Sequence, residues 1–202
     1  MSDLDDGAGG PGGAGGRSPS GGTDTVVPDL GTRRVEAVLR AHPDVREAVL
    51  LPGFGDGPGE TALVVPHGYA VGPELAAHVA AELGIAAIPA TIALLPEIPR
   101  GPDGAPDAAA VRERLASWPA VYRFELPRTS AERRVAALWC RVLDRKWVGV
   151  HDDFIELGGD SRTAALLLAE LRAEPGADVT MGDLFELATV ARLAERFGPA
   201  DG

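Results

Sequence analysis

The residues best suited to chemistry lie late in the chain, in the run Gly158-Gly159-Asp160-Ser161. The two glycines lack a Cβ atom, which permits a tight turn and a close approach by a partner. An apolar helical pattern over residues 164–171 follows, so Asp160 or Ser161 stands where a helix N-cap belongs. The unpaired N–H groups and the positive end of such a helix favour a phosphate group. We therefore interpret Ser161 as a hydroxyl presented for modification, able to carry a phosphodiester.

Other chemistry near this run is disfavoured by the spacing of the residues. One histidine and four carboxylates lie within ten residues and suggest a metal site: His151, Asp152, Asp153, Glu156 and Asp160. Their spacing matches neither a Ca²⁺ loop nor a zinc signature, so we expect a solvated acidic loop. A hydrolase pair of Ser161 and His151 has no visible third group, and Gly-Gly-Asp-Ser departs from the Gly-x-Ser-x-Gly elbow. An ordinary loop with a helix cap fits the four residues equally, so their surroundings must decide.

The composition disfavours several classes of protein. The 202-residue chain has a net charge of −11, which argues against nucleic acid or an anionic membrane surface as partner. There is no apolar run of about 18 residues, and the acidic first residues are unlike a secretory signal, so we expect a cytoplasmic protein. The single cysteine, Cys140, follows Trp139 in an apolar helical pattern, and we expect a small buried side chain.

Several motifs surround Ser161 in one order and spacing over residues 127–197. They are Pro127 to Thr129, Leu138-Trp139, Val142-Leu143, Val148 to Phe154, Leu157 to Ser161, Leu184 to Glu186, Thr189-Val190 and Leu193. Together they resemble the peptidyl carrier (thiolation) domain of nonribosomal peptide synthetases. A fatty-acid or polyketide carrier is a nearer variant, disfavoured because such carriers usually have a different residue in place of Gly159.

The resemblance implies that Ser161 receives 4′-phosphopantetheine, with Gly158, Gly159 and Asp160 presenting it. A phosphopantetheinyl transferase would attach the group, using its own Mg²⁺. An adenylating enzyme acting in trans would load an aminoacyl or aryl group as a thioester, and a downstream condensation or tailoring enzyme would collect it. We expect a partner surface beside the serine, formed in part by Arg162, Thr163, Leu166, Met181 and Phe185. For Phe185, a place in the core is equally consistent with the pattern.

Residues 127–198 are expected to form an all-α carrier bundle of four helices. Thr129 and Glu132 fit a capping box at the first helix. The second helix is expected to begin near Ser161, and the last two to cover about 182–186 and 189–197. Helical spacing and loop pattern direct the following side chains inward: Val135, Leu138, Trp139, Val142, Leu143, Val148, Val150, Phe154, Leu157, Ala164, Leu167, Leu168 and Leu171.

Residues 29–116, which we call the front unit, predict a small α+β fold. Helices are expected over 33–41, 74–83 and 107–115, and strands over 47–52, 61–66 and 91–95, the first two strands forming a hairpin with a long loop. The glycine-rich residues 1–28 are expected to be a disordered tail. Residues 117–126 are expected to be a linker that packs partly on the front unit.

The front unit resembles, more loosely, the C-terminal subdomain of adenylation (AMP-binding) enzymes. The matching runs are Leu30-Gly31, Val35 to Leu39, His42 to Val45, Glu47 to Val49, Ile88-Pro89, Leu95 to Pro99 and Pro102 to Ala105. In that family the residue after the last glycine is a lysine that orients substrate and ATP. Here it is Ala105, whose methyl group neither donates hydrogen bonds nor stabilises phosphate charge. The larger adenylation core is absent from this sequence.

The favoured hypothesis is a non-catalytic carrier preceded by a degenerate adenylation subdomain. Two hypotheses from other classes stay open. The chain could be the C-terminal half of a split adenylating enzyme that acts in trans. It could also be a docking or scaffold protein whose Ser161 is never modified. Ala105 favours a docking role for the front unit, because a site is argued from its own residues.

Overall fold

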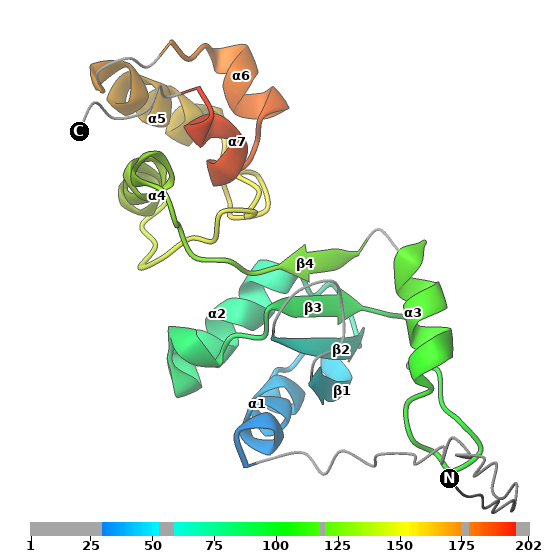
Figure 1. Cartoon of the computed structure of the whole chain (residues 1–202). Coiled ribbons are helices and arrows are strands. Elements are labelled where there is room, and N and C mark those ends of the chain that lie inside the picture. The colour runs from blue at the N-terminus through cyan, green and yellow to red at the C-terminus, as the bar shows by residue number, and fades with distance from the viewer. Residues whose placement is uncertain (1–29, 53–58, 118–119, 175–177, 197–202) are drawn as a thin grey trace, which may run out of the picture.

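The structure is a computed structural model that describes residues 30–52, 59–117, 120–174 and 178–196 (Figure 1). A mixed α+β unit comes first and a bundle of four helices follows, which is the predicted fold class. The predicted tail lies outside the described residues. So do most of the hairpin loop and the end of the last predicted helix.

The front part of the chain forms one four-stranded sheet in the order β1-β2-β3-β4 (Figure 1). The predicted hairpin is confirmed, since β1 (Val45–Pro52) pairs antiparallel with β2 (Glu60–Pro66). β3 (Thr91–Leu94) runs parallel to β2, and β4 (Val121–Arg123) runs antiparallel to β3. The sequence did not predict β4, because three residues are too few to show a strand period. This strand lies within the segment 117–126 that was expected to be a linker.

The three predicted helices of the front unit are confirmed: α1 (Leu30–Ala41), α2 (Gly72–Leu83) and α3 (Ala108–Ala116). A 3₁₀ turn, η1 (Ile85–Ala87), follows α2. α1 begins three residues before its predicted start. α2 ends at Gly84, whose φ of 90° lies in the region that favours glycine.

Helices cover both faces of this sheet. α1 and α2 pack on one face around Val35, Leu39, Leu75, Val79 and neighbouring apolar side chains. α3 contributes Val111 to a second cluster on the other face. The middle of β2 is buried on both sides, and this explains why its sequence is a continuous apolar run without alternation.

The carrier bundle consists of α4 (Ser130–Val142), α5 (Ser161–Ala173), α6 (Met181–Glu186) and α7 (Val190–Ala194). The inward positions predicted from spacing lie in its core or at the core's margin. At its centre Trp139 and Phe154 meet edge to face, with ring centroids 5.2 Å apart.

Cys140 differs from its expected buried position. It is half-buried, because its place next to Trp139 turns it away from the apolar stripe of α4 to the margin of the core. Burial raises the pKa of its thiol.

Hydrogen bonds between side chains and backbone begin α4 at the predicted residue. The Thr129 hydroxyl accepts from the N–H of Glu132 at 3.0 Å. In return the Glu132 carboxylate accepts from the N–H of Thr129 at 3.0 Å and from that of Arg128 at 2.7 Å. The predicted capping box is therefore confirmed, and these bonds hold the pKa of Glu132 below its ordinary value, with the Thr129 bond as the largest cause.

We expect the capping carboxylate to make the bundle sensitive to acid. Because the folded pKa of Glu132 is depressed, its stabilisation is present above the ordinary glutamate pKa and is lost as pH falls through the folded value. Between about pH 6 and about pH 3, Glu132→Gln should lose less unfolding free energy than the wild type, and at about pH 6 it should be about 0.5–1 kcal/mol less stable. Urea unfolding read from the NMR signals of α4 and α5 measures this. The exposed Glu97→Gln is the control, and equal acid sensitivity of wild type and Glu132→Gln would contradict the assignment.

Candidate functional site

Ser161 is the first residue of α5, and its side chain is exposed. The residue before it, Asp160, is the N-cap, as predicted for one of these two positions. The Asp160 carboxylate accepts from the N–H of Thr163 at 2.7 Å, and the Thr163 hydroxyl accepts from the N–H of Asp160 at 2.8 Å. The bond from the Thr163 N–H lowers the pKa of Asp160 most, and a bond from the Thr163 hydroxyl to the same carboxylate at 2.8 Å lowers it further, so an ionised carboxylate flanks an exposed serine at the start of a helix.

Thr163 does not belong to the exposed face on which the sequence placed it. Its side chain is buried, with only 9% of its surface exposed, because its hydroxyl completes the capping box with Asp160. Its role is therefore to fix the turn before Ser161.

The two glycines before Asp160 serve different purposes. Gly158 has a φ of +92°, a conformation that residues with a Cβ rarely adopt. At Gly159 an added Cβ would lie 2.4 Å from ring atoms and from the carbonyl oxygen of Phe154. The sequence suggested a close approach by a partner, but at Gly159 the approaching group is Phe154 of the same chain.

Phe154 is in turn fixed by the connection between α6 and α7. Its N–H donates to the carbonyl of Ala188 at 2.9 Å, and its own carbonyl accepts from the N–H of Gly159 at 2.8 Å. The preceding Asp153 pairs with Thr189 in an isolated β-bridge. The turn that presents Ser161 therefore rests on the core of the bundle.

The sequence suggested a solvated acidic loop, but one of its carboxylates is buried. Asp152 is 1% exposed and accepts from the Tyr122 hydroxyl at 2.7 Å and from the N–H of Gly149 at 2.8 Å. Burial raises the pKa of Asp152 despite these bonds. Its neighbour His151 is exposed and lies 3.3 Å from Glu125. Within the described parts of the chain, no three histidine, cysteine or carboxylate side chains are grouped so that they could hold a metal ion.

Large apolar side chains are exposed on the two helices beside the site. Leu166 on α5 is 51% exposed, and Met181 and Phe185 on α6 are 38% and 47% exposed. Of the two positions that the sequence left open for Phe185, the structure shows the one on the surface. Arg162 is exposed as well. Sequence reasoning missed Ile155, which is 51% exposed between the inward Phe154 and Leu157, where an apolar residue is easily taken for core.

Ala105 lies at the end of an ordered turn in the front unit. The N–H of Gly101 donates to its carbonyl at 2.8 Å, and its own N–H donates to Asp103 at 3.0 Å. Gly104 has a φ of +79°. The Ala105 side chain is exposed, so the turn presents a methyl group at its surface.

Comparison with known proteins identifies the bundle. Residues 133–197 match the family described as the phosphopantetheine attachment site. This part of the chain belongs to that phosphopantetheine-binding carrier family. The prosthetic group of the family is 4′-phosphopantetheine, and a carrier domain of this kind is generally non-catalytic. The carrier prediction is thereby confirmed for these residues.

Similarity to nonribosomal peptide synthetases covers more of the chain than the residues matched by the family. The chain is 38% identical over 167 residues to a probable non-canonical synthetase, CymA, of Salinispora arenicola, covering 79% of this chain and 2% of that protein. It is 30% identical over 170 residues to surfactin synthase subunit 1 of Bacillus subtilis, covering 83% and 5%. A solved nonribosomal PCP domain is 34% identical over 36% of this chain and 94% of its own, with a TM-score of 0.33. The chain thus spans only a few per cent of the length of these synthetases.

In the part of the chain that the structure describes, none of the helices is long and apolar enough to cross a membrane.

The packing of Phe154 against Gly159 predicts a specific cost for an added methyl group. Gly159→Ala should lower the free energy of unfolding by about 1–3 kcal/mol, because the ring and backbone of Phe154 must shift. Gly182→Ala in α6 is the matched control, since its Cβ would meet only Thr180 Oγ1 at 3.6 Å. Urea unfolding of the two variants measures the difference, and equal stabilities would show that Gly159 is not a packing position.

Proposed function

We propose that this chain is a carrier protein of nonribosomal peptide-type biosynthesis that holds an aminoacyl or aryl group as a thioester. The attachment point is Ser161, on a 4′-phosphopantetheine arm. The observation that carries the proposal is the exposed Ser161 hydroxyl at the N-terminus of α5, inside a phosphopantetheine attachment domain. Both the exposure and the helix position fit a phosphodiester.

The residues of the turn present Ser161 and leave the catalysis of its modification to a partner. In the proposed reaction Ser161 Oγ forms a bond to the phosphorus of coenzyme A that carries the pantetheine, and the adenosine bisphosphate leaves. The serine proton passes to a base of the phosphopantetheinyl transferase. The positive end of the α5 helix favours the negative phosphodiester, and the ionised Asp160 keeps that helix start fixed by accepting from the Thr163 N–H. When attached, the arm supplies the thiol that forms the thioester.

The front unit is proposed to be a non-catalytic docking element. Ala105 supports this, because its turn is ordered yet ends in a methyl group that cannot orient ATP. The same observation disfavours a split adenylating enzyme. The division of the chain is proposed to fall after β4, because β4 pairs with β3 of the front sheet and the two parts have hydrophobic clusters of their own.

Partner enzymes are proposed to approach the exposed side chains next to the serine. The surface consists of Arg162, Leu166, Met181 and Phe185, to which the structure adds Ile155. Exposed apolar side chains of this size are suited to transient contacts with a transferase, an adenylating enzyme acting in trans, and a condensation or tailoring enzyme. The net charge of −11 disfavours nucleic acid or an anionic membrane as partner.

Modification of Ser161 is tested by intact-protein mass after incubation with coenzyme A, Mg²⁺ and a broad-specificity phosphopantetheinyl transferase. Wild type should gain the mass of one phosphopantetheine, and Ser161→Ala should gain none. Ser130→Ala is the matched control, because Ser130 is likewise the exposed first residue of a helix that follows a capping residue. An unmodified, folded wild type, or a modified Ser161→Ala, would reject the carrier proposal.

The proposed partner surface predicts a rate effect without loss of the fold. Leu166→Ala should lower kcat/KM for modification by the transferase about tenfold, which corresponds to about 1.4 kcal/mol of lost contact. Leu30→Ala, which removes an 81% exposed leucine from α1, should leave the rate unchanged. Initial rates at several carrier concentrations give both values. Equal effects of the two substitutions would remove Leu166 from the surface.

A further inference from the structure

A partly buried hydrogen bond joins the front sheet to the carrier bundle. Tyr122, on β4 of the front sheet, donates its hydroxyl to Asp152 Oδ1 at 2.7 Å. Asp152 lies in the loop between α4 and α5 and is 1% exposed, and its Oδ2 accepts from the N–H of Gly149 at 2.8 Å. The Asp152 carboxylate thus accepts with Oδ1 from the front sheet and with Oδ2 from its own loop in the bundle.

Aromatic rings extend the same contact. Phe124 and Trp147 meet edge to face, with their ring centroids 5.2 Å apart. Trp147 belongs to the loop after α4, yet it packs against the hydrophobic cluster of the front unit together with Tyr122 and Phe124. A Cβ added at Gly149 would lie 3.3 Å from Phe124 and 3.2 Å from Asp152 Oδ1, so the backbone of this loop lies close against both side chains.

The backbone between the two parts is also fixed at consecutive residues. The N–H of Phe124 donates to the carbonyl of Ala90 in the front unit at 3.0 Å. The carbonyl of the next residue, Glu125, accepts from the N–H of Val150 in the bundle at 2.8 Å. There is thus no run of unbonded residues between the strand and the loop that could act as a hinge.

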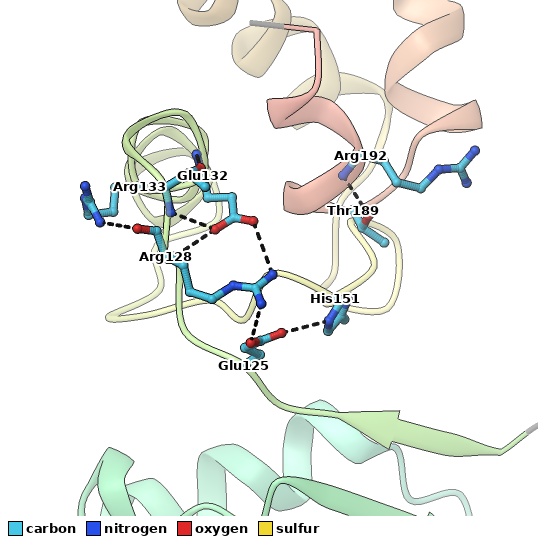
Figure 2. Close-up of polar contacts among 8 residues, drawn as sticks. Glu125, Arg128, Glu132, Arg133, His151, Thr189 and Arg192 are labelled. Atoms are coloured by element: carbon cyan, nitrogen blue, oxygen red, sulfur yellow. Dashed lines mark hydrogen bonds and ion pairs between the residues drawn. The ribbon is translucent and has the colours of Figure 1, made fainter. Parts of the chain in front are cut away.

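Ion pairs reinforce this connection. In Figure 2 the carboxylate of Glu125 lies between Arg128 and His151, at 2.8 Å and 3.3 Å. Arg128 also reaches Glu132 of α4 at 3.7 Å. These ion pairs are partly exposed, so their contribution is modest, and the contacts of the buried Asp152 and of the packed rings carry the joint.

We infer that Tyr122, Phe124, Trp147 and Asp152 form a fixed joint, so that the front unit and the carrier bundle move as one body. Parts of one chain joined by a short connection meet at an effective concentration of about 1 mM, so contacts too weak to join separate molecules can hold them together.

The joint lies in the same loop as the turn before Ser161. Asp152 lies two residues before Phe154, and Phe154 packs on Gly159 in the turn before Ser161. This inference does not depend on the modification of Ser161, so its test uses the unmodified chain.

Backbone ¹⁵N relaxation of the full chain tests the joint. In wild type, amides of β1 to β3 and amides of α4 and α5 should report one shared rotational correlation time. The double variant Tyr122→Phe/Trp147→Ala removes the hydroxyl and the ring contact. The correlation times of the sheet and of the bundle should then both become shorter and differ from each other. Tyr69→Phe is the matched control, because Tyr69 is the other tyrosine and is 90% exposed; it should behave as wild type.

Two results would overturn the inference. The first is a pair of different correlation times in the wild type. The second is a double variant that keeps native amide signals in both cores and still tumbles as one body. If the double variant does not fold, residual dipolar couplings of the wild type decide alone. They must fit one alignment tensor for both parts, and two tensors would show that the joint is not fixed.

Discussion

The presentation of Ser161 depends on the position of one ring. Phe154 packs edge to face on Trp139 in the core and lies so close to Gly159 that only a residue without a side chain fits there. The backbone of the turn therefore follows the packing of the bundle, and the N-cap Asp160 comes next in the chain. The exposed hydroxyl of Ser161 thus follows a turn whose backbone rests on a buried aromatic pair.

The sequence predicted the elements whose signals are local. The capping box of Thr129, the helix start at Asp160 or Ser161 and the helical stripe of Trp139 each need only a few neighbouring residues, and the structure confirms them. What it missed depends on residues far apart in the chain. Tyr122 and Asp152 are separated by 30 positions, so no local pattern marks Asp152 as buried or residues 121–123 as a strand.

The errors at the site have the same origin. Thr163 was expected to form part of the surface beside Ser161, but its side chain is buried and its hydroxyl closes the cap. Gly159 was expected to admit a partner, and Phe154 occupies that space instead. In both cases the residue was correctly placed near the serine, and its direction could be known only from the packing around it.

The position of β4 has a consequence for how the chain can be divided. β4 pairs with β3, so a front unit that ended at residue 116 would leave one side of β3 with unpaired N–H and C=O groups. An open strand edge is a template for adding a strand from another molecule. The carrier's connecting segment therefore also protects the neighbouring sheet from self-association, and a separable front unit has to include residues 121–123.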